Sequence, residues 1–214
     1  EDGETKETTA RFVVGADGAN STVRRRFFKA AKLRPYTAIQ QWFSSRHPTS
    51  FYSCVFDPET SDSCSWSICK DGHFIFGGAF PGKDCRARFE RQKEKLASWG
   101  FPFSEPVRTE ACLVMQPRSP RSFCCGGGGV FLIGEAAGFI SRSSFEGISF
   151  AIDSAVILSG VFARGGRDLN LAYRRATRIL RLRLFLKVLK SPFMYNPLLR
   201  YLVMKSGLRA IDIR

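Results

Sequence analysis

Two segments that lie far apart in the sequence share one design: a short apolar run ends in a glycine-rich turn with a single carboxylate. Residues 13–18 read VVGADG, and residues 132–138 read LIGEAAG. Short apolar runs of this kind are typical of strands inside a parallel sheet, and glycines after them let the backbone approach a ligand closely. A following helix offers free N–H groups and the positive end of its dipole to a phosphate or an electron-rich ring edge.

Either turn taken singly has a second interpretation, which is a connection that simply needs a positive φ. The first strand, predicted over residues 11–14, also comes almost at the start of the sequence, without earlier partner strands. Parallel strands need a crossover of about a dozen residues or more. We therefore expect the neighbours of this strand to lie upstream of Glu1 or on another chain.

The middle of the sequence predicts an antiparallel sheet with one helix. Aromatic and β-branched residues indicate strands over residues 51–56, 65–69, 73–76 and 108–115. Asp71-Gly72 predicts a tight hairpin turn, because both residues tolerate a positive φ. Asp84 is the expected N-cap of a helix rich in helix formers over residues 88–99, and Gly100 is placed to end it.

The last third returns to the first kind of structure. Pro117, Pro120 and the glycines at 126–129 indicate a loop, residues 130–133 a buried strand, and residues 145–162 a helix that Gly165-Gly166 ends. From residue 169 the sequence is helical and basic. We predict an α/β fold, α+β overall, divided into residues 1–34, 35–120, 121–166 and 167–214.

The number and spacing of cysteines and histidines argue against several kinds of site. The seven cysteines cannot all pair, they include no Cys-x-x-Cys, and only His47 and His73 could assist a metal site, so we expect reduced thiols in a cytoplasmic protein and no structural zinc. A disulfide between the adjacent Cys124 and Cys125 would be strained. No histidine lies near Ser143-Ser144, so nothing supports a hydrolase triad.

The formal charge of +14 is concentrated in the helical tail, where cations alternate with large aliphatic residues. Such a helix can lie on an anionic membrane surface. The interpretation that we prefer is a helix packed on the rest of the protein with a solvated cationic face. Nucleic-acid binding is disfavoured, because the cations are interleaved with aliphatic rather than exposed aromatic residues.

The two turns carry a resemblance to a known superfamily. Residues 15–24 (GADGANSTVR) closely resemble the Asp-Gly fingerprint of aromatic-hydroxylase-type FAD-dependent oxidoreductases, and residues 134–138 (GEAAG) with 145–148 (FEGI) resemble their second flavin motif. The form SSFEGIS at 143–149 is most similar to the geranylgeranyl-reductase-like branch. The resemblance implies a partial Rossmann-like FAD-binding domain with an inserted antiparallel substrate domain and a C-terminal helical tail.

The resemblance also implies roles for individual residues. Asp17 and Gly18 would lie near the pyrophosphate and any nicotinamide donor, with Arg24 supporting the turn. Glu135 would hold the ribityl chain or a phosphate-side hydroxyl, and the backbone N–H groups of Gly147 and Ile148 would face the N1/O2 edge of the flavin. A helix start there would stabilise the reduced flavin, whose edge is negative. The residues expected at the cofactor are Asp17, Gly18, Ser21, Arg24, Gly134, Glu135, Ala136, Gly138, Gly147 and Ile148.

Aromatic side chains of the middle sheet are candidates for an apolar substrate pocket. The expected lining residues are Trp42, Trp66 and Phe76, although each of them could instead belong to the core of the sheet. The resemblance thus implies an FAD-dependent reductase or monooxygenase, with NAD(P)H as a candidate donor and an apolar, isoprenoid or aromatic, substrate. No residue can be named as a catalytic acid or base.

Three departures from the superfamily pattern qualify this interpretation. Glu135 replaces the usual Asp, Arg142 stands where Pro is common, and Gly-x-Gly-x-x-Gly is absent from the sequence. We therefore expect the sequence to be the C-terminal part of a longer flavoprotein. Two alternatives stay open: a truncated, non-catalytic remnant of such a protein, and a basic module that binds membrane surfaces.

Overall fold

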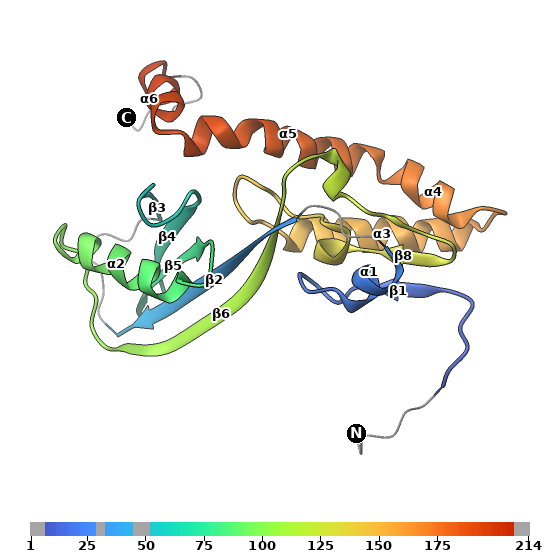
Figure 1. Cartoon of the computed structure of the whole chain (residues 1–214), viewed down its shortest axis with the longest axis horizontal. Coiled ribbons are helices and arrows are strands. Elements are labelled where there is room, and N and C mark those ends of the chain that lie inside the picture. Colours follow the sequence, from blue (N-terminus) through green and yellow to red (C-terminus); the bar gives the residue numbers. More distant parts are fainter. Residues whose placement is uncertain (1–6, 29–32, 45–51, 208–214) are drawn as a thin grey trace.

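The computed structural model describes residues 7–28, 33–44 and 52–207. The chain forms two sheets side by side, with long helices lying across both along one side (Figure 1). This mixed α/β arrangement confirms the predicted fold class.

The smaller sheet contains both glycine-rich turns. It has three strands in the order β1-β8-β7, namely β1 (Val13–Gly15), β8 (Val130–Leu132) and β7 (Gly126–Gly127). β1 and β8 are parallel, with Gly15 opposite Leu132. The expectation that every neighbour of the first strand lies upstream or on another chain is therefore wrong for one edge. The connection from β1 to β8 is the whole middle sheet rather than a short crossover helix.

The larger sheet is antiparallel throughout and has the order β3-β4-β5-β2-β6. Its strands are β2 (Leu33–Phe43), β3 (Ser53–Phe56), β4 (Cys64–Lys70), β5 (His73–Phe80) and β6 (Pro106–Pro117). The predicted hairpin turn is confirmed, since Asp71 and Gly72 have φ values of 51° and 77°. The sequence patterns did not identify β2, and the predicted residue Phe51 lies outside the described residues.

One helix, α2 (Cys85–Ala97), covers one face of the larger sheet. Phe76 and Phe89 stack at 5.5 Å between ring centroids, and both side chains are completely buried. The expectation that Phe76 lines a pocket is therefore wrong, because its side chain points into the core beneath α2. Asp84 occupies the N-cap position, but its carboxylate pairs with Arg88 at 2.8 Å and does not cap the backbone.

The remaining helices are α1 (Thr22–Phe27), α3 (Ile148–Arg164), α4 (Leu169–Ala176), α5 (Arg178–Tyr195) and α6 (Pro197–Lys205), with short 3₁₀ turns η1 (Pro120–Ser122) and η2 (Gly134–Ala137). α3 begins three residues later than predicted, because Phe145 has a φ of 53° and cannot be helical. Leu180 and Leu184 of α5 join the core around Phe131, as expected for a packed tail. No helix among the described residues is long and apolar enough to span a bilayer.

Candidate functional site

The two glycine-rich turns leave the same edge of the smaller sheet, next to one another. The carbonyl of Gly15 accepts a hydrogen bond from the backbone N–H of Ile133 at 3.0 Å, which continues the parallel pairing into both turns. A Cβ atom on Gly15 would lie 2.6 Å from Leu132 and 2.9 Å from Val23. Only glycine therefore allows α1 to pack this closely behind the strand end.

Asp17 holds the start of α1. Its carboxylate accepts hydrogen bonds from the Ser21 hydroxyl at 2.6 Å and from the backbone N–H groups of Thr22 and Val23 at 2.7 and 3.1 Å. Burial acts to raise the pKa of Asp17, but these hydrogen bonds outweigh it and lower the pKa below its ordinary value. Beside it, Gly18 has a φ of 71°, and a Cβ there would meet no atom within 4 Å. This turn is therefore rigid but open to a ligand on its outer side.

Arg24 joins the first turn to the second. Its guanidinium is buried, and it donates to the carbonyl of Ala136 at 3.1 Å and to that of Ser122 at 2.7 Å. Burial lowers the pKa of Arg24. Within the described residues no carboxylate pairs with this cation. The supporting role predicted for Arg24 thus has a specific geometry. Its hydrogen bonds hold Ser122 and Ala136, which lie 98 and 112 positions later in the sequence, against α1.

Glu135 connects the second turn to the larger sheet. Its Oε1 atom accepts a hydrogen bond from the backbone N–H of Met115, in β6, at 2.8 Å. Burial raises the pKa of Glu135 and this hydrogen bond opposes the shift without cancelling it. The predicted contact with a ribityl chain stays a prediction, and one of the two carboxylate oxygens is already engaged by the sheet.

The loop before α3 fixes the start of that helix. The backbone N–H of Ser141 donates to the carbonyl of Glu146 at 2.9 Å, and that of Phe145 donates to the carbonyl of Ser141 at 3.0 Å. The Tyr195 hydroxyl donates to the carbonyl of Ser143 at 2.7 Å. Gly147 is the N-cap, and no side chain caps the helix there. The first turn of α3 also contains no acidic residue. Its N–H groups are therefore available to an electron-rich ligand.

Tyr36 and Arg142 lie where the two sheets meet. The rings of Tyr36 and Phe145 make an edge contact at 5.3 Å, and the Tyr36 hydroxyl donates to Asp62 at 2.9 Å. Burial, with the nearby Asp62 carboxylate, raises the pKa of Tyr36. The Nε atom of Arg142 is buried without a hydrogen-bond partner among the described residues. Tyr36 was missed by sequence reasoning, because an aromatic residue in a strand gives no signal that distinguishes a site from a core.

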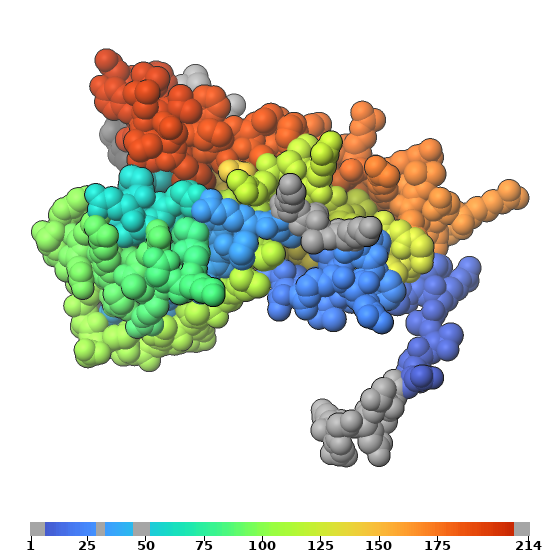
Figure 2. Space-filling view, in the orientation of Figure 1, coloured from blue at the N-terminus to red at the C-terminus, as the bar shows by residue number. Residues whose placement is uncertain are grey.

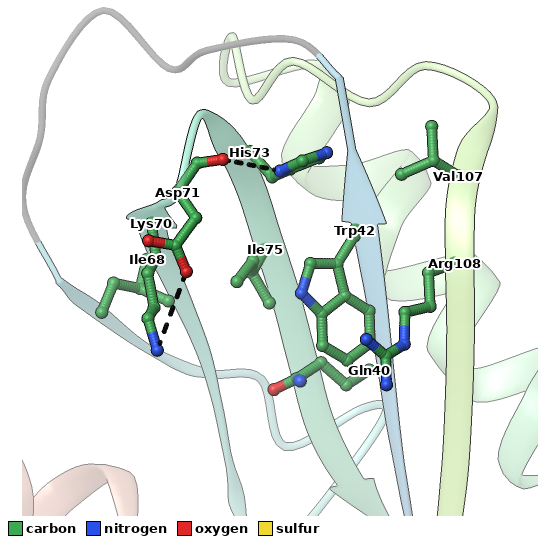
Figure 3. A pocket seen from close by; sticks show the side chains of 9 residues that line it. All are labelled: Gln40, Trp42, Ile68, Lys70, Asp71, His73, Ile75, Val107 and Arg108. Atoms are coloured by element: carbon green, nitrogen blue, oxygen red, sulfur yellow. Dashed lines mark hydrogen bonds and ion pairs between the residues drawn. The ribbon is translucent and has the colours of Figure 1, made fainter.

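A groove runs over the face of the larger sheet that α2 leaves open. Its first part has a volume of about 560 Å³ and contains Trp42, with the Arg108 guanidinium 4.8 Å from the ring centroid of the indole (Figure 3). Its second part, of about 440 Å³, contains Trp66, whose indole N–H donates to Gln40 at 3.1 Å. Gln40 borders both parts. Trp42 and Trp66 therefore border a groove on the face opposite Phe76, and their contact with a substrate stays a prediction.

Among the described residues, the cysteines and histidines form no metal site or disulfide. All seven cysteines are free thiols, and Cys124 and Cys125 are not bonded to each other. Burial raises the pKa of Cys125. His73 lines the groove and contacts the Asp71 carbonyl at 2.9 Å, whereas His47 lies outside the described residues. Within the part of the chain that the structure covers, no three His, Cys, Asp or Glu residues gather to hold a metal ion.

The chain has close relatives of greater length. No family model matches the sequence. Protein CbrA of Escherichia coli O6:H1 is 53% identical over 210 residues, which is 98% of this chain and 57% of CbrA. The chain thus spans a little over half the length of this relative.

Two solved structures have a similar fold at low sequence identity. A geranylgeranyl bacteriochlorophyll reductase-like protein from Thermoplasma acidophilum matches 95% of this chain and 51% of its own, with a TM-score of 0.60 and 18% identity. HpxO of Klebsiella pneumoniae, complexed with FAD, matches 94% of this chain and 57% of its own, with a TM-score of 0.61 and 19% identity. The chain therefore has the fold of the corresponding part of FAD-binding flavoproteins.

Proposed function

We propose that this chain provides the flavin-facing turns and the substrate sheet of an FAD-dependent oxidoreductase. The observation that carries the proposal is the double hydrogen bond of Arg24 to Ser122 and Ala136, which holds two glycine-rich strand ends together at one edge of a parallel pair. Ligands of open α/β sheets bind outside the carboxyl ends of the strands, which is where both turns lie. The similarity in fold to an FAD complex supports the same assignment.

The residues at this edge fit the isoalloxazine end of FAD. The uncapped start of α3 at Gly147 and Ile148 would hold the ring edge that becomes negative on reduction, and its dipole would favour the reduced form. The open side of Gly18 and the turn from Gly134 to Gly138 would accommodate the ribityl and pyrophosphate groups. When bound, FAD would supply the electron transfer itself. The protein would position it and exclude water.

The adenosine half of FAD is not assigned to this chain. The sequence contains no Gly-x-Gly-x-x-Gly, and the chain spans 57% of the length of CbrA from E. coli O6:H1. Residues of the longer protein would supply that half. We therefore expect the 214-residue chain to bind flavin more weakly than a full-length relative does.

The substrate that we propose is apolar, of an isoprenoid or aromatic kind, and reduced or hydroxylated with electrons from NAD(P)H. Support comes from the groove over the open sheet face, where Trp42, Trp66 and Ile75 provide apolar walls. The groove follows strands that lead to Tyr36 and Met115, beside the second turn. Oxygen consumption by the reduced holoprotein, measured with and without substrate, would separate a monooxygenase from a reductase.

Flavin titration of the purified chain tests the proposal. We expect riboflavin, FMN and FAD all to bind, with FMN and FAD binding more tightly than riboflavin, because the turns would contact the phosphate groups as well as the shared isoalloxazine and ribityl parts. Quenching of flavin fluorescence measures the dissociation constant. If no flavin binds even at millimolar concentration, the two turns and the start of α3 do not form a flavin site and the proposal is wrong.

A pair of variants at one position makes this titration specific to the start of α3. Gly147→Asp and Gly147→Asn both place a good N-cap residue at a backbone with a φ of −124°, which L-residues adopt freely. Only Asp adds a negative charge beside the proposed ring edge. We expect Gly147→Asp to weaken binding of reduced flavin about tenfold relative to Gly147→Asn, and binding of oxidised flavin much less.

A further inference from the structure

Helix α5 carries apolar side chains on two opposite faces. Leu180 and Leu184 are buried against the smaller sheet, as part of its core. On the other side, a row of five apolar residues remains more than half exposed. This outer stripe consists of Ile179, Leu182, Leu186, Leu189 and Phe193.

The outer stripe has the spacing of a single helix face. Its members follow one another by three, four, three and four residues, which places them in one line along α5. A helix that packs through one face has a polar opposite face when that face is solvated. The outer stripe therefore needs a partner that the described residues do not provide.

α6 continues this surface past the end of α5. Leu198, Tyr201, Leu202 and Met204 are all exposed, and no residue of α6 is buried. Arg200 fixes the helix in place, since its guanidinium lies 4.5 Å from the ring centroid of Phe56 and donates to the carbonyl of Met194 at 2.9 Å. α5 and α6 follow one another along the upper side of the molecule, above both sheets (Figures 1 and 2).

The charged side chains of the helices from α4 to α6 are all positive. Residues 169–207 contain nine lysines and arginines and no acidic residue. Arg183 and Lys190 border the outer stripe on one side and Arg178 borders it on the other, as the helical spacing requires. The nine cations are Arg174, Arg175, Arg178, Arg181, Arg183, Lys187, Lys190, Arg200 and Lys205.

A cationic hollow lies beside the start of α5. It has a volume of about 440 Å³, and Arg121, Arg174 and Arg181 line it together with Cys124 and Cys125. The Nε atom of Arg181 is buried and lacks a hydrogen-bond partner among the described residues. Three guanidinium groups without a carboxylate in the lining suit a phosphate group.

We propose that the outer stripe and the exposed side of α6 bind the surface of an anionic lipid bilayer. An apolar stripe with cations on both sides is the pattern of a helix that lies in the plane of a membrane interface. The leucines would enter the boundary of the acyl chains, and the cations would contact lipid phosphates, including one in the hollow at Arg181. The proposal does not depend on flavin binding.

A second copy of the chain fits this surface less well. Two outer stripes facing one another would bring nine cations of each copy together with no acidic residue between them. Juxtaposed like charges disfavour such an interface. An anionic bilayer offers both the apolar layer and the opposite charge.

Sedimentation of the 214-residue chain with sucrose-loaded vesicles tests the proposal. We expect binding to vesicles of phosphatidylglycerol and phosphatidylcholine, little binding to phosphatidylcholine alone, and weaker but measurable binding to the anionic vesicles in 0.5 M salt. Equal sedimentation with both vesicle types, or with neither, would overturn the proposal. So would a stable dimer in analytical ultracentrifugation that the outer-stripe variants below dissociate.

Matched variants separate the outer stripe from general surface hydrophobicity. Leu186→Gln with Leu189→Gln should weaken partition to anionic vesicles at least about tenfold. Ile152→Gln with Val156→Gln, which changes comparably exposed residues of α3, should leave it within about twofold. All four side chains are more than half exposed, so the variants keep the fold, which circular dichroism checks. Equal losses in the two pairs would overturn the assignment.

A second set of variants tests the flanking cations. Arg183→Gln with Lys190→Gln should weaken binding about twentyfold at low salt, because each cation near an anionic surface contributes roughly fivefold. Arg26→Gln with Lys83→Gln removes the same charge from exposed positions elsewhere and should have a much smaller effect. If the two pairs weaken binding equally, net charge rather than this surface attracts the lipid, and the proposal is wrong.

Discussion

The five-stranded sheet and the three-stranded sheet differ in where their stabilising contacts come from. The larger sheet has a core of its own, in which aromatic residues of neighbouring strands pack under α2. The strands of the smaller sheet have only two or three residues each. Side chains of α3, α4 and α5 complete its core. Long-range hydrogen bonds add to this packing: Arg24 bridges the turns, Asn170 bonds to Gly129 and Val130, and the Tyr173 hydroxyl donates to Leu132 at 3.0 Å.

This difference indicates that the larger sheet is a folding unit, whereas the smaller sheet forms only when distant segments of the chain come together. We call the smaller sheet with its two turns the platform. A platform that depends on contacts between distant segments gains stability from any ligand that bridges the same segments. The proposed flavin would contact both turns and the start of α3. The proposed substrate groove, in contrast, lies on a sheet whose shape does not depend on the cofactor.

The largest expected effect comes from Phe89→Ala, which removes a completely buried ring from the larger sheet's core. We expect the free energy of unfolding of this sheet to fall by about 4 kcal/mol. All three tryptophans, Trp42, Trp66 and Trp99, belong to this part of the chain, so fluorescence during urea unfolding reports on it alone. Trp99→Ala, at a side chain that is 76% exposed, is the control and should change stability little.

The Phe89→Ala variant also tests whether the two sheets unfold separately. Cys125 is buried in the core of the smaller sheet, so its rate of thiol labelling, located by mass spectrometry, reports on that sheet. We expect Phe89→Ala to leave this rate nearly unchanged. If labelling of Cys125 rises in step with the loss of tryptophan signal, the two sheets unfold as one unit.

Arg24→Met should destabilise the smaller sheet and leave the stability of the larger sheet unchanged. It removes the guanidinium that donates to the buried carbonyls of Ser122 and Ala136, and we expect a loss of about 3 kcal/mol in the smaller sheet. Labelling of Cys125 should accelerate strongly while the tryptophan transition stays in place. Arg26→Met, at an exposed position of the same helix, should have almost no effect. An unchanged Cys125 rate would mean that Arg24 does not hold the platform.

Opposite pH dependences should distinguish a carboxylate of each region. Burial raises the pKa of Glu135 in the native state above its ordinary value of 4.5. The contribution of the Glu135 side chain to the free energy of unfolding is therefore fully present below pH 4.5, where the carboxyl is protonated, and is lost as the pH rises through the raised pKa. We expect Glu135→Gln, which stays neutral, to be more stable than the wild type at pH 7, with the difference vanishing near pH 4. A constant difference across this range would contradict the burial of the charge.

Asp57, in the larger sheet, should behave in the reverse manner. Burial acts to raise its pKa, but hydrogen bonds from Thr60 and Lys95 outweigh burial and lower the pKa below 3.8. Its contribution is present above that value and is lost as the pH falls through the lowered pKa. Asp57→Asn should therefore be less stable than the wild type at pH 7, by about 1 kcal/mol, and the difference should shrink as the pH falls below 3.8. Urea unfolding at several pH values measures both variants.

The smallest expected effect is that of Gly18→Ala. A φ of 71° strains any residue with a Cβ atom, but that atom would meet nothing within 4 Å. We expect a loss of about 1 kcal/mol in the smaller sheet and none in the larger one. Gly147→Ala, at a φ of −124°, is the matched control without strain. A loss well above 2 kcal/mol would mean that the turn tolerates no adjustment.

Local sequence patterns predicted most of the elements around the site. The glycine-rich turns, the hairpin at Asp71-Gly72 and the end of α3 at Gly165 all follow from residues within a few positions of one another. The same patterns did not identify β2 and placed the start of α3 too early, because they could not anticipate the left-handed conformation of Phe145. They also assigned Phe76 to the pocket, although its side chain lies in the core. Trp42 and Trp66 border the groove, and their contact with a substrate stays a prediction.

What the sequence by itself determined was most of the strands, turns and helices, β2 excepted, and the type of residue that each turn carries. These depend on periodicity and on backbone preferences, which are local. Only the tertiary structure decided that β1 pairs with β8, that Arg24 reaches Ser122 and Ala136, and that α2 covers the Phe76 face and leaves the tryptophans open. Alternation along a strand separates two faces, but whether a face is core or groove depends on what packs against it. That choice is made by contacts between residues distant in the sequence, where no local pattern can record it.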